Sequence, residues 1–269
     1  MITFEHVTKR FADGTVAVED FSLVVPSHAT VVLLGSSGCG KTTLLRMVNR
    51  MVDPTSGSVR IDEEDVARLD PVALRRRIGY VMQSAGLLPH RTVGDNVATV
   101  PLLQGADRRD TRRRSLELLE LVGLPAALAD RYPSQLSGGQ RQRVGVARAL
   151  ASDPNILLMD EPFGAVDPVV RTELQNELLR IQRELAKTIV FVTHDVDEAF
   201  ALGDEILVLR RGAEVAQRGT AEDLLLRPAD EFVREFTGGD RRRFRVEQRG
   251  GVPAVVDAVG RLAGVLEPS

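Results

Sequence analysis

One eight-residue segment constrains the fold of this chain more than any other. Residues 35–42 read Gly-Ser-Ser-Gly-Cys-Gly-Lys-Thr and match the pattern G-x-x-x-x-G-K-[ST] at every fixed position. The segment follows the continuous apolar run 30–34, which is typical of a strand buried on both faces. It precedes residues 41–52, where apolar residues recur at helical spacing. A buried strand, a glycine-rich turn and a helix in this order predict the start of a parallel α/β sheet.

The residue types in this segment suit the binding of a nucleoside triphosphate. Glycine at positions 35, 38 and 40 permits backbone conformations closed to other residues. Successive N–H groups can then surround phosphate oxygens in front of the positive end of the helix. Lys41 can reach the β- and γ-phosphates, and the Thr42 hydroxyl can bind Mg²⁺. The residues expected to contact the nucleotide here are Gly35, Ser36, Ser37, Gly38, Cys39, Gly40, Lys41, Thr42 and Thr43.

Strand and helix patterns continue along the chain up to about residue 238. Strands are expected at residues 2–8, 21–25, 59–62, 78–82, 155–159 and 188–193, with a hairpin formed by 206–209 and 214–217. Helices are expected mainly over 107–150 and over 170–185. We therefore predict a sheet domain over residues 1–238, interrupted from about 84 to 150 by a helical insertion, and a short tail of small residues over 239–269.

The composition narrows the possible functions. Lys and Arg together number 35 against 38 Asp and Glu, for a net charge of −3, and this balance predicts no nucleic-acid partner. No apolar run approaches the roughly 20 residues of a bilayer-spanning helix, and the first ten residues contain no apolar stretch typical of a secretory signal. A single cysteine, Cys39, excludes an internal disulfide and suits a reducing cytoplasm.

A second glycine motif distinguishes this chain from other nucleotide-binding proteins. Residues 136–140 read Leu-Ser-Gly-Gly-Gln and precede a helical pattern over 141–151. Ser137 suits an N-cap, and the two glycines leave N–H groups exposed, so this helix start is a second anion site. These residues resemble the signature motif of ATP-binding cassette (ABC) ATPases, and the resemblance covers about residues 1–236 in the family's order of motifs. It implies an α/β P-loop NTPase of ABC type: a RecA-like sheet core, an antiparallel β subdomain and an inserted helical subdomain.

The same resemblance assigns roles to four further residues. Asp160 ends a segment that looks like the Walker B strand and would bind Mg²⁺ together with Thr42 and Gln83. Glu161 lies where the family has its catalytic glutamate, which polarises the attacking water. His194 resembles the switch histidine that contacts the γ-phosphate, and Gln83 resembles the Q-loop glutamine that responds to Mg²⁺ and moves the helical subdomain.

Other residues are expected at the nucleotide through the family's dimer. Residues 165–167 resemble the D-loop, although the segment 164–167 reads Gly-Ala-Val-Asp where Ser-Ala-Leu-Asp is commoner; Asp167 is retained. Phe11 lies where the family stacks an aromatic ring on adenine. In the family the signature motif of one cassette closes over the ATP of a second copy, in a head-to-tail dimer. The signature residues expected at the partner's ATP are Ser137, Gly138, Gly139 and Gln140.

The spacing of the motifs bears on the branch of the family. Lys41 and Ser137 are 96 positions apart, which leaves no room for the long coiled coil of DNA-repair relatives. The chain has one phosphate loop, whereas ribosome-acting relatives carry two cassettes. A transporter ATPase without membrane spans requires separate permease subunits, as is typical of bacterial importers.

Three segments look most like the quaternary-amine uptake branch: residues 49–57, 86–93 and 161–171. This resemblance implies an ATP-hydrolysing subunit that drives uptake of glycine betaine, choline, carnitine or proline from a peripheral position on the cytoplasmic face of the cell membrane. A solute-binding protein would be an indirect partner. Two alternatives stay open: an importer ATPase for another small solute such as an amino acid, and an ABC ATPase without a role in transport.

Three smaller expectations complete the interpretation. The 30 residues after Gly239 are too few for one complete CBS regulatory module. The Cys39 thiol is expected to become inaccessible when ATP binds. Leu87 and Leu88, in a turn-rich stretch after Gln83, are expected to be exposed and to contact the permease; the alternative is that both pack into the core of the insertion.

Overall fold

The central sheet is largely parallel. The computed structural model describes residues 1–164, 166–239, 245–249, 252–256 and 261–265, and within these residues six strands form the sheet in the order β10-β9-β3-β8-β7-β6. The strands are β3 (Thr30–Gly35), β6 (Ile78–Val81), β7 (Ile156–Asp160), β8 (Thr188–Thr193), β9 (Glu205–Leu209) and β10 (Val215–Gly219). Only β10 pairs antiparallel. Every residue of β3, β7 and β8 is buried, as expected for strands covered on both faces.

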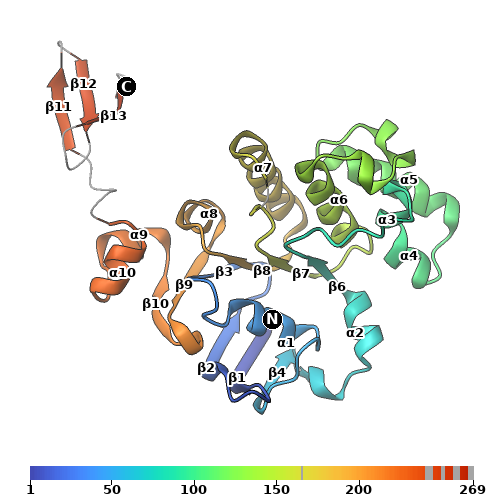
Figure 1. Cartoon of the computed structure of the whole chain (residues 1–269), viewed down its shortest axis with the longest axis horizontal. Helices are drawn as coiled ribbons and strands as arrows, with labels where there is room; N and C mark the ends of the chain where they lie inside the picture. Colours follow the sequence, from blue (N-terminus) through green and yellow to red (C-terminus); the bar gives the residue numbers. More distant parts are fainter. Residues whose placement is uncertain (165, 240–244, 250–251, 257–260, 266–269) are drawn as a thin grey trace.

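A second, antiparallel sheet packs against the first across helix α1. Its strands lie in the order β2-β1-β4-β5: β1 (Ile2–Arg10), β2 (Val16–Val25), β4 (Ser56–Ile61) and β5 (Glu64–Asp65). Helix α1 (Lys41–Val48) lies beside this sheet (Figure 1). Phe4 of β1, Leu33 of β3 and Leu45 of α1 belong to one continuous apolar cluster, which therefore joins the two sheets.

The predicted helical insertion lies at one end of the central sheet, beside β6 (Figure 1). Its helices are α3 (Val93–Val97), α4 (Thr99–Leu103), α5 (Arg108–Leu121) and α6 (Gly138–Leu150), with short 3₁₀ turns at Ala126–Asp130 and Pro133–Gln135. A 3₁₀ turn, Val66–Arg68, and helix α2 (Pro71–Arg77) precede β6. Val97, Leu119 and Val144 pack together in the apolar core of the insertion.

The other helices cover the remaining face of the central sheet and its far end. They are α7 (Pro168–Leu185), α8 (Val196–Leu202), α9 (Ala221–Leu226) and α10 (Glu231–Phe236), and a 3₁₀ turn, Arg211–Ala213, joins β9 to β10. Leu178 of α7 and Leu202 of α8 join Phe191 of β8 in the same apolar core that serves the insertion. Among the described residues, no helix combines the length and apolar character needed to cross a bilayer.

The tail of small residues forms strands that were not expected from its sequence. Three short antiparallel strands follow the main domain: β11 (Arg245–Arg249), β12 (Val252–Val256) and β13 (Leu262–Val265). Residues 245–249 read Arg-Val-Glu-Gln-Arg, with one apolar residue in five, so hydrophobic periodicity gave no signal for a strand. The domain boundary at residues 238/239 stays a prediction.

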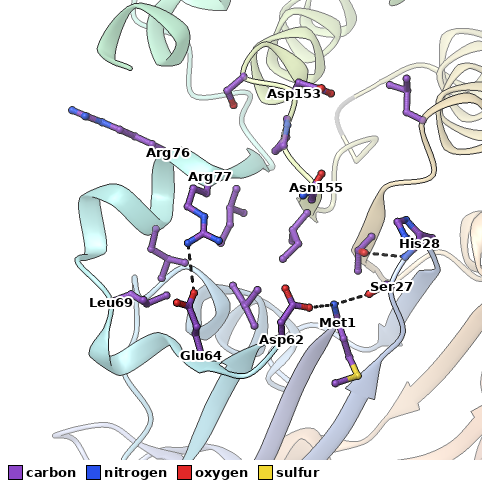
Figure 2. A pocket seen from close by; sticks show the side chains of 18 of the residues that line it. Met1, Ser27, His28, Asp62, Glu64, Leu69, Arg76, Arg77, Asp153 and Asn155 are labelled. Carbon is purple, nitrogen blue, oxygen red and sulfur yellow. Dashed lines mark hydrogen bonds and ion pairs between the residues drawn. The ribbon is translucent and has the colours of Figure 1, made fainter. Parts of the chain in front are cut away.

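A pocket of about 470 Å³ opens at the amino ends of β6, β7 and β8 (Figure 2). Four of its charged groups form two pairs: the Met1 amine lies 2.8 Å from Asp62, and Arg77 lies 3.7 Å from Glu64. None of the expected nucleotide-contacting residues is among the described residues that line it. The phosphate loop lies at the opposite, carboxyl edge of the sheet, so we assign no part of the nucleotide site to this pocket.

The close approach of α6 to β6 gives a test of the fold. A Cβ on Gly79 of β6 would lie 2.5 Å from the carbonyl oxygen of Ala149 and 2.5 Å from Cδ2 of Leu157. We therefore expect Gly79→Ala to lower the free energy of unfolding by about 1–3 kcal/mol, measured by urea denaturation.

Gly145→Ala is the matched control, since Gly145 lies on the same helix, where it faces the turn after β6. Its Cβ would meet Ala85 at 3.5 Å, an ordinary contact, and alanine favours a helix interior by about 1 kcal/mol over glycine. We expect its free energy of unfolding to be unchanged or higher. Equal losses in the two variants would contradict the packing of α6 on β6.

Candidate functional site

The phosphate loop connects β3 to α1 at the carboxyl edge of the central sheet. Gly38 and Gly40 have φ values of +78° and +116°, in the region that favours glycine. A Cβ on Gly40 would lie 2.3 Å from the carbonyl oxygen of Ala17 in β2. Glycine is therefore required at position 40 for two reasons, its backbone conformation and its contact with the antiparallel sheet.

Lys41 lies inside the loop and is 4% exposed. Its Nζ donates hydrogen bonds to the carbonyl oxygens of Gly35 at 2.6 Å and of Ser36 at 2.8 Å. A triphosphate would offer this ammonium group charged oxygens in place of neutral ones, and charge-assisted hydrogen bonds are about twice as strong. The loop thus holds its cation in position for phosphate.

An oxygen pair at the start of α1 and the end of β7 fits a magnesium ion. The Thr42 hydroxyl donates to Asp160 Oδ1 at 2.8 Å, and the Tyr80 hydroxyl lies 3.4 Å from Asp160 Oδ2. Burial raises the pKa of Tyr80, so its hydroxyl stays protonated and able to donate. Mg²⁺ is usually held by one or two carboxylate or hydroxyl oxygens together with substrate phosphates. The donor set at Thr42 and Asp160 matches this chemistry.

The Glu161 carboxylate joins two of the other expected site residues. Gln83 Nε2 donates to Glu161 Oε2 at 3.0 Å, and His194 Nδ1 lies 3.2 Å from the same oxygen. The three side chains follow three neighbouring strands, β6, β7 and β8, at the edge where the phosphate loop also lies. Glu161 thereby contacts residues 78 positions before it and 33 positions after it in the sequence.

The Glu161 backbone is also constrained. Its φ is +45°, and its N–H donates to the carbonyl oxygen of Val192 in β8 at 2.9 Å. A non-glycine residue in the left-handed region is strained by about 1–3 kcal/mol. The hydrogen bond to β8 holds Glu161 in this conformation.

The turn that carries Gln83 is held by α6. Gln142 donates to the carbonyl oxygen of Met82 at 3.1 Å, and the Arg148 guanidinium donates to those of Ala85 and Gly86, each at 2.6 Å. Burial lowers the pKa of Arg148 from its ordinary value. The turn and the helix that follows the signature motif therefore form one packed unit.

Residues 136–140, which we call the signature turn, are held by a capping box at the start of α6. Ser137 Oγ accepts from the Gln140 N–H at 3.2 Å, and Gln140 Oε1 accepts from the Ser137 N–H at 2.9 Å. The expected N-cap role of Ser137 is confirmed. Ser137 and Gly138 are exposed, so the N-terminus of this helix faces solvent.

The remaining expected residues lie at the margins of the site. Phe11 is 40% exposed in the turn between β1 and β2, with Lys9 Nζ 5.4 Å from its ring centre. Asp167 is exposed just before α7, and Ala165 lies outside the described residues. The phosphate loop contains Ser36 and Ser37, and Thr43 follows it in α1. The contacts of all these residues with nucleotide stay predictions.

Two expectations about exposure are wrong. Cys39 is 1% exposed and belongs to the core between the sheets, with its Sγ 3.8 Å from Lys41 Nζ. The thiol lies inside the loop, where a Cβ on Gly35 would lie 2.8 Å from its Sγ. Leu87 and Leu88 are half-buried, and Leu87 packs on the core of the insertion, because the turn after Gln83 folds back on α6.

Several residues that shape the site escaped the sequence interpretation. Tyr80, Gln142 and Arg148 contact Asp160 or the turn around Gln83, but each lies in a segment that reads simply as strand or helix. Arg148 carried one signal, since it is the one charged residue in the otherwise apolar run 144–151.

The geometry defines a class of protein: an α/β P-loop NTPase in which the phosphate loop, Asp160, Glu161, Gln83 and His194 lie at one edge of the sheet. The profile of the family described as ABC transporter matches residues 18–164. The chain belongs to the ABC transporter family. The predicted fold class and family are confirmed.

Individual relatives of this chain are also members of the same family. The carnitine transport ATP-binding protein OpuCA of Listeria monocytogenes is 49% identical over 241 residues, which are 90% of this chain and 60% of the relative. The glycine betaine uptake system ATP-binding protein YehX of Escherichia coli is 52% identical over 238 residues, 88% of this chain and 77% of the relative. A solved dimeric ATP-binding cassette, MJ0796 in a post-hydrolysis state with ADP and Pi, has a TM-score of 0.76 and 35% identity, covering 82% of this chain and 98% of that one.

The burial of Cys39 leads to a revised prediction. Because its thiol is enclosed between Gly35 and the core, we expect thiol reagents such as DTNB to label the native protein slowly with or without nucleotide, and rapidly only in denaturant. Rapid labelling of the native protein that ATP suppresses would contradict the inward orientation and restore the first expectation.

Proposed function

We propose that this chain hydrolyses ATP with Mg²⁺ and that Glu161 is the catalytic carboxylate. The observation that carries the proposal is the contact of Glu161 with both Gln83 and His194 at the sheet edge where the phosphate loop begins. A carboxylate beside the γ-phosphate can polarise and orient an attacking water.

The other expected site residues would bind and orient the nucleotide and the metal ion. Lys41 and the N–H groups of the phosphate loop would hold the β- and γ-phosphates, and His194 would donate to a γ-phosphate oxygen. Thr42 and Asp160, with the side-chain oxygen of Gln83, would hold Mg²⁺, which supplies neutralisation of the charge on the β- and γ-oxygens. Positioning and charge neutralisation make up most of the catalysis in phosphoryl transfer.

We further propose that the active form is a head-to-tail dimer. The exposed N-terminus of α6, with Ser137, Gly138, Gly139 and Gln140, suits the phosphates of ATP bound to a second copy. Asp167 would lie at the same junction, and Phe11 would stack on adenine. The dimeric state of a cassette with the same fold supports this arrangement.

The transport role is proposed from the relatives. The chain spans about 60% of the length of the carnitine relative OpuCA, and relatives named for carnitine, choline and glycine betaine transport are 45–52% identical to it over 229–241 aligned residues. We infer an ATPase subunit on the cytoplasmic face of the membrane, joined to separate permease subunits and fed by a solute-binding protein, that drives uptake of quaternary-amine osmoprotectants. The half-buried Leu88 stays our candidate for the permease contact.

Two substitutions separate nucleotide binding from hydrolysis. Lys41→Ala removes the phosphate-binding charge and is expected to abolish both. Glu161→Gln keeps the shape but removes the carboxylate, so we expect hydrolysis to fall by about 10²–10⁴-fold while ATP stays bound and the dimer accumulates. Phosphate release and size-exclusion chromatography with Mg-ATP measure the two effects.

Glu184→Gln is the control, since Glu184 is a surface carboxylate on α7 paired with Arg180. It is expected to behave as wild type. A Glu161→Gln protein that stays monomeric yet hydrolyses ATP at the wild-type rate would refute the assignment.

The solute class is tested by uptake. Cells that lack their own osmoprotectant importers and express this chain with its permease are expected to accumulate radiolabelled glycine betaine or choline at high salt, and Lys41→Ala is expected to abolish this. Accumulation of an amino acid in place of quaternary amines would favour the alternative importer. ATP hydrolysis without uptake of either would favour an ABC ATPase outside transport.

A further inference from the structure

Arg171, in the first turn of α7, contacts two loops at the carboxyl edge of the sheet. Its guanidinium donates to Asp195 Oδ2 at 3.2 Å and to the carbonyl oxygen of Val166 at 3.4 Å. Its Nε lies 3.7 Å from Glu198 Oε1. Helices α7 and α8 also contact each other directly. Arg171 therefore connects the loop before α7 to the loop before α8.

The two carboxylates hold the backbone on both sides of His194. Asp195 caps α8 by accepting from the N–H groups of Asp197 and Glu198 at 2.8 and 3.2 Å. Glu198 accepts from the Thr193 hydroxyl at 2.6 Å, and that hydroxyl accepts from the Asp195 N–H at 3.0 Å. The residues that flank His194 are thus tied to one network.

The network contains a deeply buried charge. Glu198 is 3% exposed, and burial raises its pKa, while the Thr193 hydrogen bond and the charge of Arg171 act in the opposite direction. Removing one partner of a buried ion pair leaves an uncompensated charge. Without Arg171, Glu198 must take up a proton or move toward solvent, and either change alters its bond to Thr193.

We propose that Arg171 is a positioning residue for His194. The His194 side chain is 59% exposed, so packing does not enclose it and its place beside Glu161 depends on the backbone that Arg171 helps to hold. The inference rests on the proposed function, in which His194 acts at the γ-phosphate. A displacement of about 1 Å in a catalytic group can cost on the order of 10²-fold in rate.

Arg171→Met tests the proposal, because it keeps the aliphatic length and removes the guanidinium. We expect kcat for ATP hydrolysis to fall about 10- to 100-fold, with KM for ATP within about twofold of wild type, since Lys41 and the phosphate loop are unchanged. Arg180→Met is the matched control on the same helix, where Arg180 pairs with Glu177 and Glu184. We expect it to keep the wild-type kcat.

A double-mutant cycle with His194→Ala separates positioning from general stability. If Arg171 acts through His194, Arg171→Met adds no further loss in the His194→Ala background, measured by single-turnover hydrolysis of radiolabelled ATP. A full further loss in that background, or a wild-type kcat in Arg171→Met alone, would overturn the inference. A wild-type rate in His194→Ala would overturn the proposed role of His194 and this inference with it.

Thermal unfolding is measured for each variant to verify that the protein is folded at the assay temperature. Should Arg171→Met be unfolded at the assay temperature, Arg171→Lys and Glu198→Gln take its place in the same cycle. Arg171→Lys keeps the charge without the planar fork and is expected to lose less kcat than Glu198→Gln, again with little change in KM. Wild-type kcat in both variants would overturn the inference.

Discussion

The parallel pairing of β3, β7 and β8 is the constraint on which the rest of the structure depends. Leu34 of β3 lies opposite Thr193 of β8, and Val192 of β8 lies opposite Asp160 of β7. The strands therefore end at one level, and the phosphate loop and Glu161 emerge from the sheet side by side. Their apolar residues are buried on both faces, so a slip in register would cost core packing as well as the site.

The sequence predicted the parts of the site that repeat a local pattern. The phosphate loop and the Ser137 cap are determined by consecutive residues, and both have the expected local form. Exposure was less predictable: Cys39 and Leu87 are covered by elements distant in the sequence. Contacts such as that of Arg148 with the turn after Gln83 were missed for the same reason, since they arise from the packing of a whole helix rather than from spacing. In the tail, β11 carried too little apolar periodicity to be recognised, and the short apolar runs of β12 and β13 contain Pro253 and Gly264, residue types that are depleted in strands.

The structure also links parts of the site that lie in different subdomains. Gln83 contacts Glu161 in the sheet core, while the turn that carries it is bonded to α6, whose N-terminus is the signature turn. The turn that carries Gln83 is therefore joined through α6 to Ser137, which lies five residues before Gln142 and eleven before Arg148, about 8 and 16 Å along the helix.

The fit of Gly40 against Ala17 has a thermodynamic consequence. Because the carbonyl oxygen of Ala17 in β2 occupies the space beside Gly40, the antiparallel sheet helps to fix the conformation of the phosphate loop. By thermodynamic linkage, a ligand that binds this conformation of the loop also stabilises the packing of the two sheets against each other. Nucleotide affinity therefore depends on how stably the two sheets pack together. Substitutions in β2 that loosen this packing should lower the affinity even where they lie far from the phosphates.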